Sequence, residues 1–395
     1  MPRVMQILNR LNMGGISLNA AILSKYLAPE YETLLVTGMI DETEESSDFL
    51  LHNMGLKPVY IPEMYRAIDP LRDRKAYFKI KQLIKEFKPD IVHTHAAKAG
   101  TLGRLAAAAC KVPVIVHTFH GHVFHSYFPG WQTRMFIGIE RFLAEKSSCI
   151  ISISERQRRE LSKIYKICSH EKIEVVPLGF DLSRFSDMSG EKRKLFRSKY
   201  LVDDDEIAIV IVGRLVPVKN HGLFLRSIQS VAARSRKKIR AFIVGDGEER
   251  KNLEALAQSL ELDFTDFESA PRKATVTFTS WIRDIDNVYA GSDVVALTSL
   301  NEGTPMSIIE GLAAGKPIVA TRVGGITDIV HPGLNALIAP RTSERVFSKH
   351  LLRLVDDDAL RNNMAQYKDG IMERFNSYRL VKDMSQIYSQ LLTAS

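Results

Sequence analysis

The sequence has few cysteines and no long apolar runs, and each of these shortages excludes a class of protein. Three cysteines occur in 395 residues (Cys110, Cys149 and Cys168) without a Cys-x-x-Cys pair, which argues against a disulfide scaffold or a zinc ribbon. The apolar stretches are far shorter than the roughly 18 residues that a membrane-spanning helix needs. The amino terminus also lacks the apolar core and cleavage site of a secretory signal. We therefore expect a cytoplasmic protein that does not span a membrane.

Composition is ordinary for a globular protein, with 45% hydrophobic and 25% charged residues. The length exceeds what one core usually serves, which predicts two or three domains. Lysine and arginine outnumber aspartate and glutamate by 54 to 46, a net charge of +8. A basic surface suits phosphate-bearing ligands, nucleic acid or an anionic membrane, and the charge alone does not choose among them.

Short apolar runs alternate with amphipathic segments along both halves of the chain. Because these runs are apolar throughout, they predict parallel strands covered by helices on both faces. The pattern breaks in the polar stretch 177–205, so we expect two doubly wound α/β domains, 1–185 and 186–374. The segment 375–395 predicts a helix with an apolar stripe that docks on one of them. The strand-like runs are 3–8, 32–37, 90–95, 113–120, 148–154, 207–213, 241–247, 275–280, 293–299 and 317–321.

The most informative segment is 297–325, LTSLNEGTPMSIIEGLAAGKPIVATRVGG. After a strand, Gly303 allows close backbone approach and Pro305 suits the first turn of a helix. The free N–H groups at such a helix start form an anion site. Glu302 and Glu310 flank it, and a carboxylate can accept hydrogen bonds from two neighbouring hydroxyls. A nucleotide-sugar has this layout, with a hexose, a diphosphate and a ribose in line.

A cationic turn, VGRLVPVKN at 212–220, follows the first strand of the second domain. Arg214 and Lys219 lie on this turn at the carboxyl end of the strand, where doubly wound sheets bind ligands. Two cations there would neutralise the charge of a leaving diphosphate while a glycosidic bond breaks. An exposed basic turn without a ligand is the alternative interpretation.

Gly14 and Gly15 follow the first strand and open the first helix. This is the position of a phosphate loop, but neither GxGxxG nor the Lys-Ser/Thr of a P-loop is present, which argues against a dinucleotide or ATP. Two interpretations stay open: a tight turn that touches a diphosphate or an acceptor, and a simple strand–helix connection.

Histidines gather after the strand at 113–120, where His117, His120, His122 and His125 occur. A metal site would need a further convergent ligand and supporting partners. We therefore expect no metal here, and we regard His120 as the best candidate to face a ligand.

A second strand of the first domain ends in His93 and His95, and Lys98 and Arg104 follow it. Because the carboxyl ends of parallel strands share one edge of a sheet, His95, Lys98 and Arg104 are candidates to line an acceptor pocket.

Two aspartate strings resemble those that hold a metal on a nucleotide-sugar. Asp284 and Asp286 lie where a helix should begin, which favours helix capping. Asp356–Asp358 separates two helical patterns and indicates a loop. Neither string supports metal dependence.

The stretch 125–146 interleaves aromatic and basic side chains, as an interfacial helix that meets lipid does. An ordinary surface helix with a core face has the same pattern, and both interpretations stay open. The residues are Tyr127, Phe128, Trp131, Arg134, Phe136, Arg141, Phe142 and Lys146.

The order and spacing of several motifs resemble those of the GT-B glycosyltransferases of family 4, a large retaining group. The motifs are GRLVPVKN, GDGEER, SDVVALTSLNEGTPMSIIEGLAAGKPIVAT and VGG. The resemblance covers nearly the whole chain, and its most specific part is the block that contains Glu302 and Glu310. It implies two Rossmann-like domains with the substrate cleft between them, no metal or other cofactor, and a last helix that crosses back to the first domain.

The resemblance also implies roles for individual residues. Arg214 and Lys219 would hold the donor diphosphate. Glu302 would contact the transferred sugar, with His120 beside it, and Glu310 would bind the ribose hydroxyls. The residues whose backbone would lie near sugar, phosphate or acceptor are Gly14, Gly15, Gly303, Thr304, Pro305 and Met306.

The chain departs from the family pattern in two places. The stretch 261–278 is longer than the usual connection, and Ser280 stands where glycine is common. The second departure concerns the backbone that would contact the nucleotide base.

We therefore expect a retaining transferase that moves a hexose or N-acetylhexosamine from a UDP-sugar to a glycan or lipid-linked acceptor. Such a reaction belongs to cell-surface polysaccharide or glycoconjugate synthesis. The basic charge adds the hypothesis of peripheral attachment to the inner face of an anionic membrane. A sugar-nucleotide epimerase of the same architecture and a two-domain sugar-binding protein are the alternatives. Nucleic-acid binding is not expected, because no recognisable module gathers the basic residues.

Overall fold

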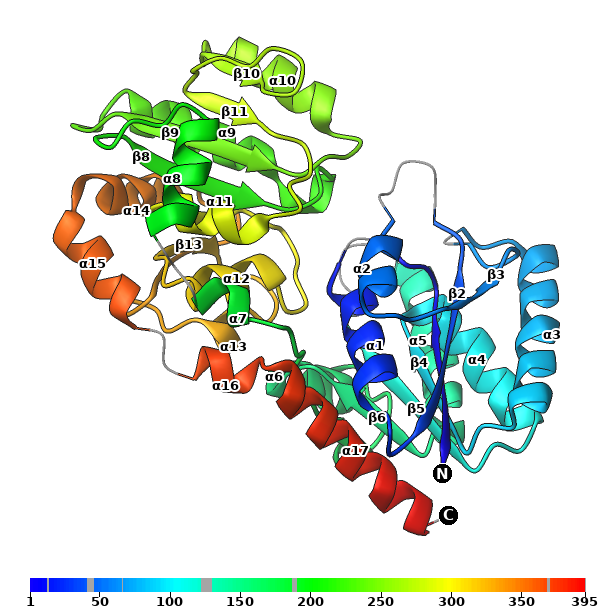
Figure 1. Cartoon of the computed structure of the whole chain (residues 1–395). Coiled ribbons are helices and arrows are strands. Elements are labelled where there is room, and N and C mark those ends of the chain that lie inside the picture. Colours follow the sequence, from blue (N-terminus) through cyan, green and yellow to red (C-terminus); the bar gives the residue numbers. More distant parts are fainter. Residues whose placement is uncertain are drawn as a thin grey trace. The chain divides into compact units, whose positions relative to one another are not determined.

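The computed structural model describes residues 1–12, 14–40, 46–65, 67–121, 130–186, 190–367 and 370–394 (Figure 1). The chain divides into two compact units. The amino-terminal unit comprises Met1–Phe180 together with Arg374–Ser395, and the carboxyl-terminal unit comprises Asp181–Glu373. These limits lie within five residues of the boundaries expected from the sequence.

The amino-terminal unit is built on a parallel sheet of seven strands in the order β3-β2-β1-β4-β5-β6-β7. In its centre, Leu8 of β1 lies opposite both Thr37 of β2 and His95 of β4. The chain therefore winds first to one side of β1 and then to the other. The strands are β1 (Arg3–Leu8), β2 (Glu32–Gly38), β3 (Val59–Ile61), β4 (Ile91–His95), β5 (Val114–Phe119), β6 (Cys149–Ser152) and β7 (Ile173–Val175).

Helices cover both faces of this sheet. On one face α1 and α17 pack together over the strands through Leu23 and Met384, and on the other α3 and α4 pack through Ile80 and Ala106. The helices are α1 (Gly15–Tyr26), α2 (Asp48–Asn53), α3 (Pro70–Phe87), α4 (Ala97–Ala109), α5 (Gly130–Lys146), α6 (Glu155–Arg159), the short η1 (Glu160–Ile164) and η2 (His170–Lys172), α16 (Ile371–Arg374) at the boundary of the units, and α17 (Ser377–Ala394).

The last helix, α17, packs on the amino-terminal unit along its apolar stripe. Leu380, Met384 and Tyr388 are buried against α1 and the strands. Arg379 donates hydrogen bonds to the carbonyls of Pro177 and Leu178. The other stripe residues on this core are Val381, Ile387, Leu391 and Leu392.

The carboxyl-terminal unit has a second parallel sheet of seven strands, in the order β10-β11-β9-β8-β12-β13-β14. The long stretch 261–278 supplies its edge: β10 pairs with β11, and β11 pairs with β9. The doubly wound α/β fold expected for both halves is therefore confirmed. The strands are β8 (Ile207–Val212), β9 (Ile239–Val244), β10 (Phe264–Asp266), β11 (Val276–Phe278), β12 (Val294–Leu297), β13 (Ile318–Thr321) and β14 (Ala336–Ala339).

The helices of this unit again lie on both faces of its sheet. One core contains Phe224 of α9, Leu253 of α10 and Phe347 of α14. Elsewhere, Phe196 of α8 contacts Phe242 of β9 edge to face. The helices are α7 (Ser183–Ser186), α8 (Gly190–Lys199), η3 (Pro217–Lys219), α9 (His221–Ala232), α10 (Arg250–Ser259), α11 (Ile285–Gly291), α12 (Met306–Ala313), α13 (Ile326–Ile329), α14 (Glu344–Asp356) and α15 (Asp358–Gln366).

The two aspartate strings belong to helix starts and ion pairs. Asp284 immediately precedes α11, but its side chain makes no capping hydrogen bond, so the capping prediction was wrong in that respect. Asp286 instead pairs with Lys192 at 3.1 Å. Asp357 caps α15 by accepting from the N–H of Leu360.

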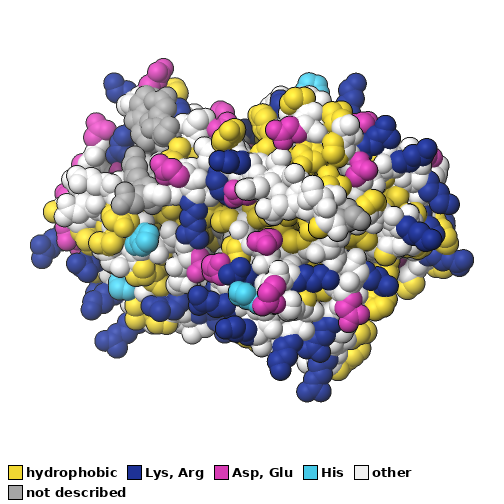
Figure 2. Space-filling model, turned by 90° about the horizontal axis from the view of Figure 1, so that it is seen from below, with side chains coloured by type: hydrophobic (Ala, Val, Ile, Leu, Met, Phe, Trp, Pro, Cys, Tyr) yellow, Lys and Arg dark blue, Asp and Glu magenta, His cyan; other side chains and the backbone are white. Residues whose placement is uncertain are grey.

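On the face that Figure 2 presents, Lys and Arg side chains are spread widely, with Asp and Glu side chains between them. Among the helices that the structure describes, none is both long and apolar enough to cross a bilayer.

Candidate functional site

Each sheet reverses its winding direction between two central strands, and the predicted site residues lie at those points. In the amino-terminal unit the reversal falls between β1 and β4, and in the carboxyl-terminal unit between β8 and β12. Loops that leave such strands at their carboxyl ends diverge and leave room for a ligand. The two edges are described in turn, starting with the carboxyl-terminal unit.

Lys219 and Glu302 come together at the edge between β8 and β12. The Lys219 Nζ lies 2.6 Å from Glu302 Oε1, and the same oxygen accepts a hydrogen bond from the Ser299 hydroxyl at 2.5 Å. Both charged side chains are largely buried, which strengthens their attraction relative to a surface pair. The cation is therefore held in place before any ligand arrives.

Arg214 lies on the same turn as Lys219 and is partly exposed. A Cβ on Gly213 would lie 3.6 Å from the Lys219 Cε, which is an ordinary contact distance, so the packing of this turn does not require glycine at position 213. Gly245, at φ +135°, is closer still, since a Cβ there would be 2.1 Å from the Gly213 carbonyl oxygen. Gly245 of the GDG motif therefore lets the backbone after β9 touch the backbone after β8.

The VGG motif supports the Glu302–Gly303 turn. Gly324 has φ +48°, and a Cβ on it would lie 1.7 Å from the Glu302 carbonyl oxygen. The next residue, Gly325, donates its N–H to the Gly303 carbonyl at 2.9 Å. A side chain at Gly324 would therefore push away the backbone that carries Glu302.

Helix α12 begins at Met306, one residue later than the sequence indicated, because Pro305 is its N-cap and not part of its first turn. No side chain caps this helix start. Gly303, Thr304 and Met306 are partly exposed. An uncapped helix start with partly exposed residues suits an anionic ligand at the positive end of the helix.

Glu310 is buried on α12, with 9% of its surface exposed. Burial raises the pKa of its carboxyl to about 7, although the hydrogen bond from Tyr289 and the charge of Arg184 act in the opposite direction. The Tyr289 hydroxyl donates to Oε2 at 3.0 Å. The carboxylate retains further acceptor capacity for ligand hydroxyls.

His221 was missed in the sequence analysis. It opens α9 directly after the cationic turn, it is 2% exposed, and neither ring nitrogen has a partner among the described residues. Burial, followed by the charge of Lys219, lowers its pKa to about 3. Its position immediately after VPVKN was the only available signal.

In the amino-terminal unit, Gly14 and Gly15 form the start of α1. Gly14 is extended and exposed, and no side chain caps the helix. A Cβ on Gly14 would meet nothing within 4 Å. The turn is therefore open to a ligand and does not need glycine at position 14 for internal packing.

His95 and His120 contact each other at the ends of β4 and β5. His95 Nδ1 lies 2.9 Å from His120 Nε2, and His95 Nε2 lies 2.7 Å from Gln6 Oε1. His120 Nδ1 is buried and has no hydrogen-bond partner among the described residues. Burial lowers the pKa of His120 to about 3 and that of His95 well below its usual value. Both imidazoles are thus neutral, and the hydrogen bond between His95 and His120 holds the His120 ring in place.

The structure gives Lys98 and Arg104 other partners than an acceptor. Lys98 pairs with Asp73 at 2.5 Å and remains partly exposed. Arg104 is fully buried and donates to Glu140 at 2.6 Å and to the Gly100 carbonyl at 2.9 Å. The prediction that Arg104 lines an acceptor pocket was wrong, because its guanidinium joins α4 to α5 inside the unit.

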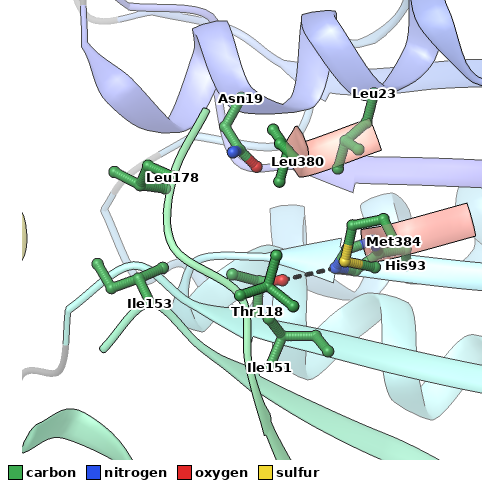
Figure 3. A pocket seen from close by; sticks show the side chains of 10 residues that line it. Asn19, Leu23, His93, Thr118, Ile151, Ile153, Leu178, Leu380 and Met384 are labelled. Carbon is green, nitrogen blue, oxygen red and sulfur yellow. Dashed lines mark hydrogen bonds between the residues drawn. The ribbon is translucent and has the colours of Figure 1, made fainter. Parts of the chain in front are cut away.

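A small pocket lies next to this edge, beneath α17 (Figure 3). His93 donates to or accepts from Thr118 at 2.7 Å along its wall. Asn19, Leu380 and Met384 approach from α1 and α17. The lining is mostly apolar, and its polar side chains are His93 and Thr118 on β4 and β5 and Asn19 on α1.

His122, His125, Tyr127 and Phe128 lie outside the described residues. Among the residues that the structure does describe, no cluster of histidine, cysteine and carboxylate side chains could hold a metal ion.

The chain is similar to several known glycosyltransferases. A protein similar to this chain is the UDP-Gal:alpha-D-GlcNAc-diphosphoundecaprenol alpha-1,3-galactosyltransferase of Escherichia coli, 28% identical over 348 residues, 86% of this chain and 85% of that protein. The D-inositol 3-phosphate glycosyltransferase of Saccharomonospora viridis is 27% identical over 320 residues, covering 77% and 71% of the two chains. The structure of Anabaena HepE in complex with UDP-glucose has a TM-score of 0.79 at 19% identity and covers 98% of this chain and 99% of that one.

Two family models match the chain, one in each half. Residues 13–184 match "Glycosyltransferase Family 4", and residues 192–370 match "Glycosyl transferases group 1". The first match includes the edge with His95 and His120, and the second includes the edge with Lys219 and Glu302. The chain therefore belongs to the family 4 glycosyltransferases and is an enzyme that transfers a sugar.

Proposed function

We propose that the enzyme is a retaining glycosyltransferase that moves a hexose or N-acetylhexosamine from a UDP-sugar to a glycan or lipid-linked acceptor. The observation that carries this proposal is the buried Lys219–Glu302 pair beside the uncapped start of α12. A cation and a helix start suit a diphosphate, and a fixed carboxylate suits the hydroxyls of a sugar.

The donor diphosphate binds to Arg214, Lys219 and the backbone from Gly303 to Met306 in this proposal. The Lys219 ammonium already pairs with the Glu302 carboxylate. When the diphosphate binds, the ammonium contacts it in place of Glu302 or together with it, and the side chain is already ordered. A preorganised cation stabilises the charge that develops on the leaving phosphate more effectively than a flexible one does.

Glu310 binds the ribose of the donor. Its carboxylate lies one helical turn beyond Met306, and Tyr289 orients it from behind. A carboxylate with one oxygen fixed by a tyrosine can accept hydrogen bonds from the two adjacent hydroxyls of a ribose. Base recognition belongs to the turn around Ser280, whose φ of +52° is the left-handed conformation that glycine adopts more easily.

The choice of a UDP-sugar and of a lipid-linked acceptor rests on relatives. The similar E. coli protein is named as a galactosyltransferase that uses UDP-Gal and a GlcNAc-diphosphoundecaprenol acceptor. The similar Anabaena structure holds UDP-glucose. We propose the same donor class here, and an acceptor used in cell-surface polysaccharide or glycoconjugate synthesis.

The reaction we propose needs no metal and no strong protein base. The acceptor hydroxyl oxygen bonds to the anomeric carbon while the bond from that carbon to the phosphate oxygen breaks. The hydroxyl proton passes to the leaving phosphate on the same face, so the anomeric configuration is retained. The side chains contribute positioning and charge: Lys219 at the phosphate, and Glu302 and His120 at the sugar.

A mass-spectrometric screen of nucleotide-sugars against glycan and lipid-diphosphate acceptors tests the proposal. We expect one UDP-sugar to give a product heavier than the acceptor by one sugar residue, and NMR of the product to show the anomeric configuration of the donor. An inverted product would contradict the retaining mechanism. Conversion of a donor without any acceptor would instead identify a sugar-nucleotide epimerase.

We also propose that helix α5 attaches the enzyme to the inner face of an anionic membrane. Trp131, Met135, Ile139 and Phe142 follow one another at helical spacing and are exposed, Trp131 by 66% and Phe142 by 50%. Arg134 and Lys146 lie on the same exposed part of the helix. An apolar stripe with flanking cations suits a surface of anionic lipid.

Sedimentation with vesicles tests the attachment. We expect binding to vesicles that contain anionic lipid, weaker binding at high salt, and loss of binding in Trp131→Ala with Phe142→Ala. The matched control is Phe78→Ala on α3, which removes another exposed aromatic side chain. Binding that is independent of both lipid charge and salt would contradict this proposal.

A further inference from the structure

A continuous chain of hydrogen bonds connects His120 to the last helix of the protein. From His120 it passes through His95 to the Gln6 amide, at 2.9 and 2.7 Å. Gln6 Nε2 donates to the Tyr388 hydroxyl at 3.2 Å, and that hydroxyl lies 2.5 Å from His93 Nδ1. His93 Nε2 meets Thr118 at 2.7 Å, on the wall of the pocket beneath α17 (Figure 3).

Each link of this chain constrains the next, because a neutral imidazole has one donor and one acceptor nitrogen. Gln6 turns its oxygen toward His95, so His95 donates from Nε2 and must accept at Nδ1. His120 therefore donates from Nε2 to His95. Its other nitrogen, Nδ1, is left as an acceptor that is buried and has no partner among the described residues.

The opposite direction of the chain is also stereochemically complete, but it is less favourable. If the oxygen and nitrogen of the Gln6 amide exchanged places, donor and acceptor would exchange roles in each hydrogen bond, and His120 would carry its proton on Nδ1. That proton would be a buried N–H without an acceptor among the described residues. Buried N–H groups without partners are rarer in proteins than buried acceptors without donors.

Neutrality of the histidines is required for this argument, and burial supplies it. Desolvation lowers the pKa of His93 and of His120 to about 3, and it lowers the pKa of His95 well below its usual value. All three rings are therefore neutral at physiological pH. Once the donor-to-acceptor direction of the hydrogen bonds is fixed, each ring has one defined tautomer.

We propose that Gln6 and Tyr388 are positioning residues that fix His120 as its Nε2–H tautomer, so that Nδ1 accepts a hydrogen bond from a hydroxyl of the transferred sugar. This inference rests on the proposed function, in which His120 contacts that sugar. It gives α17 a part in the reaction, since the Tyr388 hydroxyl links Gln6 to His93 within the amino-terminal unit.

The test is nitrogen NMR of the full-length enzyme labelled with ¹⁵N-histidine, combined with kinetics of Tyr388→Phe. In the wild type we expect His120 protonated at Nε2 only. In Tyr388→Phe the Gln6 amide keeps a single partner, so both of its orientations become populated and a signal for Nδ1–H of His120 appears. Turnover of the UDP-sugar falls about tenfold, because a mixed tautomer population still contains the competent form. Affinity for UDP, which has no transferred sugar, stays unchanged.

Tyr31→Phe is the matched control. The Tyr31 hydroxyl also contacts α17, where it donates to the Ser385 carbonyl, and its ring packs edge to face on Tyr388. Because the Tyr31 hydroxyl takes no part in the series of hydrogen bonds from His120 to Thr118, its loss should leave both the His120 tautomer and the turnover as in the wild type. Gln6→Met breaks the chain directly beside His95 and serves as a second variant if Tyr388→Phe does not fold.

Three results would overturn the inference. The first is protonation of His120 at Nδ1 in the wild type, and the second is an unchanged tautomer in both variants. The third is a changed tautomer with unchanged sugar transfer, which would remove the link to the sugar. Absence of transfer from every nucleotide-sugar in the wild type would count against the proposed function instead, and the NMR result would still stand.

Discussion

The edges at the carboxyl ends of the strands differ in charge between the two sheets: one edge carries an ion pair, and the other carries neutral polar side chains. At the carboxyl-terminal edge, Lys219 and Glu302 form an ion pair beside an uncapped helix start. At the amino-terminal edge, His95 and His120 are neutral and joined to amide and hydroxyl groups. One edge presents charge in a fixed place, and the other presents hydrogen-bond acceptors and donors without charge.

This difference matches the two parts of a nucleotide-sugar. A diphosphate is an anion, so binding it requires cations that the protein keeps charged and oriented. A sugar is uncharged and offers mainly hydroxyls, and a neutral imidazole can bind them without the desolvation cost of a buried ion. In the proposed function, Lys219 faces the leaving group that develops charge, whereas the sugar meets one charged side chain, Glu302, from the carboxyl-terminal unit and one neutral side chain, His120, from the amino-terminal unit.

The exception to this division is the buried Arg104–Glu140 pair in the amino-terminal unit. Arg104→Met leaves Glu140 buried without its partner, and we expect a loss of about 3–5 kcal/mol in the free energy of unfolding. Denaturant unfolding measures it, and Arg104→Met combined with Glu140→Leu should recover most of the loss. If the single variant were as stable as the wild type, the pair would have no structural role.

Lys219→Ala tests the charged edge directly. We expect kcat to fall by about 10²–10³, because the leaving phosphate loses a preorganised cation. Initial rates of sugar transfer measure the effect. Lys237→Ala, which removes an exposed ion pair with Asp358, is the control and should retain activity. Full turnover in Lys219→Ala would contradict the electrostatic half of the comparison.

Glu310→Gln tests the ribose contact. Above pH 7 we expect UDP affinity about tenfold lower than in the wild type, because hydrogen bonds to a charged acceptor are stronger than those to an amide. The gap should narrow as the pH falls below about 7, where the wild-type carboxyl takes up a proton. Calorimetry at both pH values measures this, and the titration of UDP itself cancels between the two proteins. Equal affinities above pH 7 would exclude the ribose role.

The same substitution should have the opposite effect on stability. The pKa of Glu310 rises from 4.5 in a free carboxyl to about 7 in the fold. The folded state therefore binds this proton more tightly than the unfolded state does, and wild-type stability declines as the pH rises between these two values. Glu310→Gln lacks this decline, so it should be the more stable protein at pH 8 in denaturant unfolding. Parallel pH profiles of the two proteins would refute the shifted pKa.

Ser280→Gly should have the smallest effect. Glycine removes the strain of φ +52°, but it also removes the hydrogen bond from the Ser280 hydroxyl to Asp246 at 3.0 Å. Both contributions are about 1 kcal/mol and oppose each other. We expect thermal unfolding within a few degrees of the wild type and an unchanged preference for UDP over other nucleotides. A change of nucleotide preference would assign the serine itself to base recognition.

Much of the charged edge could be predicted from the sequence. Lys219 and Glu302 lie in the connections that follow two apolar strands, and parallel strands bring their carboxyl ends to one edge regardless of the separation along the chain. The family motifs added which strands are neighbours. The glycines at 245 and 324 were visible as motifs, but only the structure shows that each touches the backbone of another loop.

The neutral edge was much harder to predict. Tyr388 appeared as one member of an apolar stripe, and nothing local indicates that its hydroxyl meets Gln6, 382 residues away. Arg104 was misread because a basic residue in a helix usually faces water, whereas here the adjacent GRLAAAA segment is buried on most sides. Polar side chains inside a core find their partners through packing, which periodicity does not describe.

The order of synthesis gives the docking of α17 a consequence for folding. The strands and α1 of the amino-terminal unit leave the ribosome first, but the helix that covers their apolar face follows only after all of Asp181–Glu373. Until then, side chains such as Leu23 and Val176 lack their cover, and such exposed surface invites aggregation. The amino-terminal unit therefore cannot complete this core until its last helix has been synthesised.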